Sequence, residues 1–113
     1  MTRYIISFPS EAMVFPEEDL PEVARAAHAA LDEIKAAGAY VFGGGLNEDV
    51  APVRVTADGA VKDGPYPQTE GLWGGFTIVD VATRDEALMW AAKIADACRC
   101  DQEVREFQYD PES

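Results

Sequence analysis

The sequence predicts an α+β fold of the ferredoxin-like (split βαβ) kind, in which two helices cover one face of an antiparallel sheet. Two segments with apolar residues at three- and four-residue spacing alternate with short runs rich in β-branched and aromatic residues. The resulting order is strand, helix, strand, two hairpin strands, strand, helix, strand. A chain of 113 residues has room for one main core, so we expect one domain spanning residues 1–113.

Six short runs predict the strands. They are residues 3–8, 39–42, 53–56, 61–62, 76–81 and 103–109. Asp58-Gly59 favours a tight hairpin turn between the third and fourth strands. The run 43–45 is Gly-Gly-Gly without the Lys-Ser/Thr of a phosphate loop, so we expect only a flexible loop there. The connection 63–75 is much longer than a hairpin turn and rich in glycine and aromatics, which suggests a binding loop.

The two helices are predicted over residues 22–37 and 84–98. Proline and glutamate at 21–22 suit a first turn, and Gly38 supplies a stop. Thr83 and Glu86 form a capping box for the second helix. The apolar stripes are Val23, Ala27, Ala30, Leu31 and Ile34 on the first helix, and Ala87, Trp90, Ala91, Ile94 and Cys98 on the second. Both stripes are expected to pack on the sheet.

A sheet with helices on one side leaves its other face uncovered. We expect Tyr4, Ile6, Ile78 and Phe107 to line that second face, and these side chains are too apolar to remain in water. A second copy of the chain would cover them at the least cost. The sequence therefore predicts a homodimer.

Composition disfavours several classes of partner. The chain carries 21 Asp and Glu against 9 Lys and Arg, a net charge of −12, which repels nucleic acid and anionic membranes. No apolar run approaches the roughly 20 residues of a membrane span, and the N-terminus lacks the features of a secretory signal, so we expect a cytoplasmic protein. Cys98 and Cys100 lie too close for good disulfide geometry and lack further zinc ligands. We predict no metal and no cofactor.

One motif and several weaker matches indicate a family. Residues 63–66 read Asp-Gly-Pro-Tyr, and they are followed by the glycine pair 74–75, by Asp80 at the end of a strand, and by the helix start Asp-Glu-Ala-Leu at 85–88. This pattern resembles the YCII-related, DGPF-motif family, whose signature is DGPFAETKE. The similarity extends over nearly the whole chain. It implies a ferredoxin-like subunit that pairs in a dimeric α/β barrel-type assembly.

Three positions depart from the family signature. Gln68 stands where the signature has Glu, Glu70 where it has Lys, and Gly71 where it has the last Glu. Roles that depend on those charges do not transfer to this chain. Relatives often occur beside sigma-factor genes, and the resemblance establishes no biochemical activity.

Two residues are candidates for acid–base chemistry. His28 is the only histidine, at the border of the first helix's apolar stripe, and an imidazole suits proton transfer near neutral pH. Related YCII proteins carry a histidine at a similar point. Asp63 opens the Asp-Gly-Pro motif. The structural alternatives are a half-buried imidazole bonded to a carbonyl and an aspartate that only shapes a turn.

Two further residues are candidates for holding a substrate. Arg54 alternates with two valines in its strand, and its guanidinium suits a carboxylate from Asp63, from Asp80 or from a ligand. Tyr66 would stack on a ligand or fill an edge of the core.

The sequence thus leaves two functions open. One is a small-molecule enzyme with a His28/Asp63 pair, together with Arg54 and Tyr66, in a pocket of the dimer. The alternative is a non-catalytic ligand-binding or regulatory domain associated with transcription (sigma-factor) systems. Both include a small-molecule ligand as a partner, and neither fixes its identity.

Overall fold

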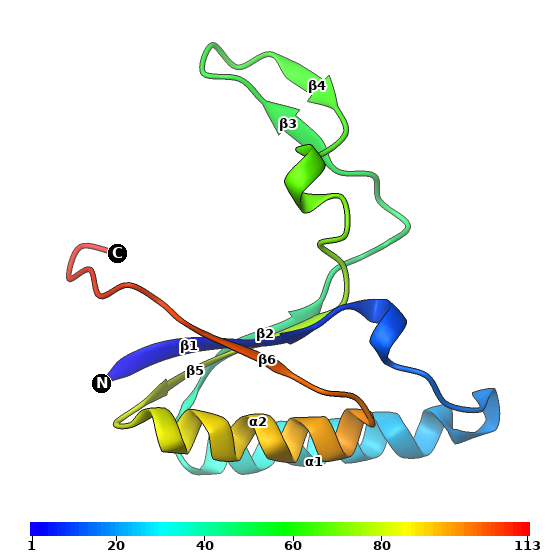
Figure 1. Cartoon of the computed structure of the whole chain (residues 1–113), viewed down its shortest axis with the longest axis vertical. Coiled ribbons are helices and arrows are strands. Elements are labelled where there is room, and N and C mark those ends of the chain that lie inside the picture. The colour runs from blue at the N-terminus through cyan, green and yellow to red at the C-terminus, as the bar shows by residue number, and fades with distance from the viewer.

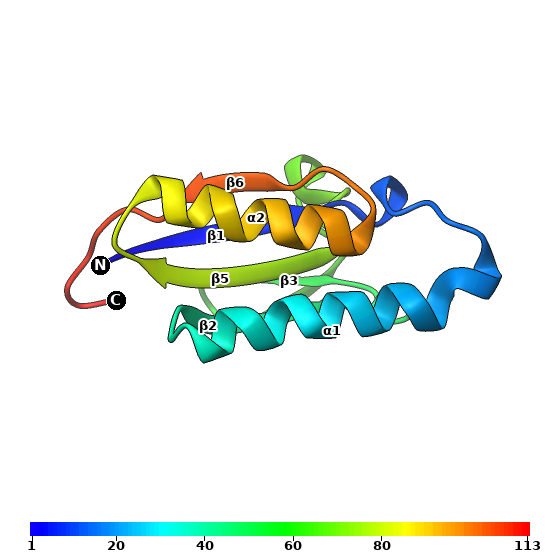
Figure 2. The same cartoon turned by 90° about the horizontal axis from the view of Figure 1, so that it is seen from below.

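A computed structural model describes all 113 residues and has the predicted α+β architecture (Figure 1). Its main sheet has four antiparallel strands in the order β2-β5-β1-β6. The elements of this body are β1 Thr2–Phe8, α1 Leu20–Ala36, β2 Tyr40–Gly45, β5 Gly75–Val81, α2 Arg84–Cys98 and β6 Glu103–Glu106. Both helices cover the same face of the sheet (Figure 2). Short 3-10 turns occupy Ser10–Ala12, Glu17–Asp19 and Pro67–Thr69.

The core lies between the helices and the sheet. Strand pairing places Tyr4 opposite Val79, and both side chains are buried in the core cluster with Ile34 and Trp90. The prediction that Tyr4 and Ile6 line the helix-free face is therefore wrong: they are 3% and 1% exposed and belong to the core. Alternation along β1 gives the other face to its odd-numbered residues.

The helices form as their patterns predict. All five apolar stripe residues of α2 are buried, and on α1 Val23, Ala30 and Ile34 are buried while the other two are half-buried. The N–H of Glu86 donates to the Thr83 hydroxyl at 3.2 Å, which confirms the predicted cap.

The triple glycine belongs to a strand and is not a flexible loop, contrary to our prediction. Gly43, Gly44 and Gly45 end β2 and pair with β5. A Cβ on Gly43 would lie 3.1 Å from the Tyr40 hydroxyl oxygen and 3.2 Å from the Phe76 carbonyl oxygen. Close approach of neighbouring groups, rather than mobility, explains glycine here.

The predicted hairpin forms, but it leaves the body of the molecule. β3 (Val53–Val55) and β4 (Val61–Asp63) make a separate two-stranded sheet. We call residues 46–73 the arm; it rises from the helix-free side of the main sheet (Figures 1 and 2). The radius of gyration is 15.9 Å, against about 13 Å for a compact domain of this length. No residue of the arm is buried.

Glycines let the base of the arm lie against the end of β1. The N–H of Leu46 donates to the carbonyl of Gly74 at 3.1 Å and joins the two ends of the arm. Gly74 has a φ of +121°, and a Cβ there would overlap the Phe8 carbonyl oxygen. The arm therefore starts beside Phe8, at one end of the sheet.

Candidate functional site

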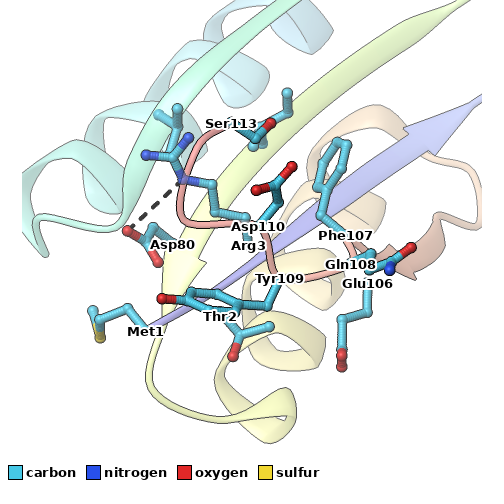
Figure 3. A pocket seen from close by; sticks show the side chains of 12 residues that line it. Met1, Thr2, Arg3, Asp80, Glu106, Phe107, Gln108, Tyr109, Asp110 and Ser113 are labelled. Carbon is cyan, nitrogen blue, oxygen red and sulfur yellow. Dashed lines mark ion pairs between the residues drawn. The ribbon is translucent and has the colours of Figure 1, made fainter.

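A cavity of about 480 Å³ opens on the helix-free face at the end of the sheet away from the arm (Figure 3). Its floor comes from β1 and β5, and the chain after β6 forms one wall. The lining side chains that matter chemically are Arg3, Val41, Ile78, Asp80, Phe107 and Asp110. The volume falls in the range of small-molecule pockets.

Strand register brings an ion pair to the cavity floor. Arg3 on β1 is the pairing partner of Asp80 on β5, so both side chains leave the sheet on the same face. Arg3 Nε lies 4.0 Å from Asp80 Oδ2, as the dashed line in Figure 3 marks. The other carboxylate oxygen, Asp80 Oδ1, is buried and has no hydrogen-bond partner in the subunit. A buried acceptor without a partner is costly. The whole Asp80 side chain is 33% exposed, so a rotation of its carboxylate would present this oxygen to a donor in the cavity.

The cavity lining combines acidic and apolar side chains. Asp110 joins Asp80 in the lining, whereas Arg3 is its only basic side chain. Glu106 also borders the cavity, but it pairs with Tyr4, so its carboxylate lies on the helix-covered face. Glu106 accepts a hydrogen bond from the Tyr4 hydroxyl at 3.1 Å. Burial, and then this bond, raise the pKa of Tyr4, which keeps the hydroxyl protonated as a donor.

Three of the predicted site residues gather at the base of the hairpin. Arg54 Nε donates to the carbonyl of Gly64 at 3.2 Å, and Nη2 donates to that of Asp63 at 3.5 Å. The guanidinium also lies 6.0 Å from the centre of the Tyr66 ring. Arg54 thus binds the backbone of the Asp-Gly-Pro turn instead of the carboxylate that we expected. The Asp63 side chain is exposed and forms no ion pair.

His28 is separated from these residues. It lies on α1, where it is exposed and not at the edge of the core. It belongs neither to the cavity lining nor to the arm. Because the hairpin leaves the sheet on the helix-free side, the sheet stands between α1 and the arm (Figure 1). One subunit does not bring His28 to Arg54 and Asp63, although we had expected them to converge.

The cavity itself was missed by the sequence prediction, although a signal for it exists. Arg3 and Asp80 are charged residues inside otherwise apolar strands, on the face opposite the core residues Tyr4 and Val79. Opposite charges at such positions in two strands are a sign of paired side chains.

The cysteines are free thiols with little reactivity. Cys98 is buried and Cys100 is half-buried. Burial raises the pKa of both, with smaller contributions from Cys100 to the first and from Asp101 to the second. The thiols therefore stay protonated near neutral pH and are weak nucleophiles. No group of three or more His, Cys, Asp or Glu side chains is placed to hold a metal ion.

The fold and the cavity define a small α+β subunit with a ligand-sized hollow on an open sheet face. The family model of the YCII-related domain matches residues 3–108. The chain belongs to the YCII-related domain family, as the sequence resemblance indicated. No curated protein matches the chain. None of its helices combines the length and the apolar character needed to cross a membrane.

Proposed function

We propose that this protein is a non-catalytic ligand-binding domain that senses a small molecule bearing a cationic amine on an apolar body. The observation that carries the proposal is the Asp80 carboxylate, which lines a cavity with excess negative charge and has one oxygen, Oδ1, without a hydrogen-bond partner. An ammonium group there would make a charge-assisted hydrogen bond worth about 1.5–3 kcal/mol.

The rest of the ligand would lie on the apolar lining. Val41, Ile78 and Phe107 supply a surface for an aromatic or aliphatic body of modest size. Arg3 stays on the other carboxylate oxygen of Asp80 and holds the carboxylate in place. A sensor needs no tuned proton donor, which agrees with the position of His28 outside the cavity. A regulatory role in a transcription system would use this same site.

The catalytic alternative needs His28 and Asp63 to act as an acid–base pair in a pocket of the dimer. These residues lie on elements that the sheet separates, and a dimer joined through the helix-free faces leaves α1 on the outside. Replacement of His28 is therefore expected to leave ligand affinity unchanged.

We further infer that the subunit is ferredoxin-like and pairs through its helix-free faces in a dimeric barrel-type homodimer. The order β6-β1-β5-β2, with a helix after the first and third of the chain's four sheet strands, supports the first point. Exposed apolar side chains on the helix-free face support the second. Phe42, which pairs with Ile78, is 65% exposed, and Phe107 is 42% exposed.

Isothermal titration with phenethylamine, 2-phenylethanol and phenylacetate tests the proposed function. The amine should bind best, and Asp80→Asn should weaken its binding by about tenfold or more, because the charge-assisted bond is lost. Asp85→Asn, an exposed carboxylate in the first turn of α2, is the matched control and should change nothing. Equal binding of the alcohol and the amine, or an unchanged affinity in Asp80→Asn, would contradict the proposal.

A further inference from the structure

We propose that the arm of one subunit covers the cavity of a second copy of the chain, so that the binding site is completed in trans. This proposal rests on the proposed function of the cavity and adds a partner segment to it. The argument starts from the arm, which lacks a core of its own.

One face of the arm is an apolar surface that nothing in the subunit covers. Val53, Val55 and Val61 are 53%, 66% and 65% exposed, and the pairing of Val55 with Val61 places their side chains on the same face. The opposite face is different, because Arg54 binds the turn and lies over Tyr66 there. A two-stranded hairpin is marginally stable alone in water, so the valine face needs another surface.

The positions of the arm and the cavity fit a two-fold exchange. The arm starts beside Phe8, at one end of β1, and the cavity is lined by Arg3, near the other end. The arm rises on the helix-free side (Figure 1), and Arg3 and Asp80 of the cavity lie on that same face of the sheet. A two-fold axis that lies between two such faces, parallel to them and perpendicular to the strands, therefore brings each arm over the cavity end of the other subunit. Such a contact is isologous and closes at two copies.

The rim of the cavity has exposed aromatic side chains that could cover the valine face. Phe107 and Tyr109 are 42% and 82% exposed, and both line the cavity. The charges also match. Asp63 pairs with Val53 on the arm and its carboxylate has no ion pair, whereas the Arg3 side chain is 57% exposed with only a 4.0 Å contact to Asp80. A second copy thus supplies an anion for Arg3 and apolar contacts for the valines.

Cross-linking between differently labelled chains tests this geometry. Both preparations carry Cys98→Ala and Cys100→Ser, and circular dichroism checks that this background is folded. One preparation also carries Ala57→Cys near the arm tip, and the other carries Gln108→Cys at the cavity. A bis-maleimide should join the chains only when the two preparations are mixed. Val55→Asp/Val61→Asp should abolish the product, and Val14→Asp, the same change at an exposed valine outside the arm, should not. A dimer in sedimentation that gives no mixed product, or a monomer, overturns the proposal.

Amine titration separates this inference from the proposed function. If the arm completes the site, the double valine variant should bind phenethylamine about tenfold more weakly than the control. Full affinity in that variant, with binding still dependent on Asp80, overturns the arm inference and leaves the proposed function standing. Absence of amine binding together with a mixed cross-link overturns the proposed function and supports the covering arm.

Discussion

Two glycines with positive φ differ in what surrounds them. Gly64, in the Asp-Gly-Pro motif, has a φ of +84° and no atom within 4 Å of a Cβ position, whereas a Cβ on Gly74 would overlap the Phe8 carbonyl oxygen. Gly64→Ala should therefore cost only the backbone strain, about 1 kcal/mol, and Gly74→Ala roughly 3 kcal/mol or more because β1 must also shift. Urea unfolding measures both, and equal losses would contradict this difference.

Gly64 has the positive φ that glycine adopts readily in a turn, and a second comparison follows from it. Gly64→Val should destabilise the protein more than Tyr66→Ala. A β-branched side chain is strained at this φ, while Tyr66 is 65% exposed and loses little contact area. Equal, small shifts in melting temperature for the two variants would show that the turn tolerates a side chain.

Arg99 combines a strained backbone with an ion pair. It is the only non-glycine residue with positive φ, at 59°, and it ends α2 while Nη1 binds Asp19 Oδ2 at 2.8 Å. Relief of the left-handed strain is worth about 1 kcal/mol, and an exposed ion pair about 0.2–1 kcal/mol. Arg99→Gly should thus be close to neutral, and Arg99→Ala, which keeps the strain and loses the pair, should be less stable by roughly 1 kcal/mol in urea unfolding. A glycine variant less stable than the alanine variant would contradict this.

Residue types alone could not assign the two faces of β1. The run Arg3 to Phe8 has apolar residues on both faces, so its alternation does not say which face meets the helices. Tyr4 and Ile6 were therefore placed on the wrong face. The stripe of α2 was predicted correctly because its apolar positions recur at three- and four-residue spacing, which places them on one face of the helix.

At the scale of elements, the hairpin shows what local chemistry determines and what it does not. Asp58-Gly59 predicted the turn, and Gly59 has a φ of +91° there. The turn residues, however, do not determine whether the two strands join the main sheet or form a separate one. Here they leave it, and for that reason the expected convergence of His28 with Asp63 fails while the contact of Arg54 with the Asp63 backbone exists.

The turn of the arm should respond to acid through Asp58. Its carboxylate accepts hydrogen bonds from the Thr56 hydroxyl and then from the Ala60 N–H, and these lower its pKa. A depressed pKa stabilises the folded turn above the unfolded value, about 3.9, and this contribution is lost as the pH falls through the lower folded value. Carboxyl NMR titration should show a lower pKa for Asp58 than for exposed aspartates, and Thr56→Val should raise it. An unchanged pKa in that variant would exclude the hydroxyl as the cause.

For the whole molecule, the layer arrangement was predictable and the extended shape was not. Helix periodicity and strand order give two helices on one face of an antiparallel sheet. The dimensions, 43 × 42 × 19 Å, reflect an arm without buried residues, and no local pattern in residues 46–73 says that it would stand away from the body. Prediction of the cavity likewise requires the tertiary arrangement, because Arg3 and Asp80 are brought together by the register of β1 and β5.

The proposed homodimer should depend on the helix-free face and not on the helices. Phe42 lies on that face beside Ile78, and an aspartate there would place a charge in a desolvated interface between two chains that each already carry −12. Phe42→Asp should therefore be a monomer by light scattering at micromolar concentration, with a melting temperature that no longer rises with protein concentration. Leu88→Asp is the control, because Leu88 is exposed on α2 and should leave the dimer intact. A stable monomer for the unmodified chain would contradict the dimer itself, and a dimeric Phe42→Asp would place the interface elsewhere.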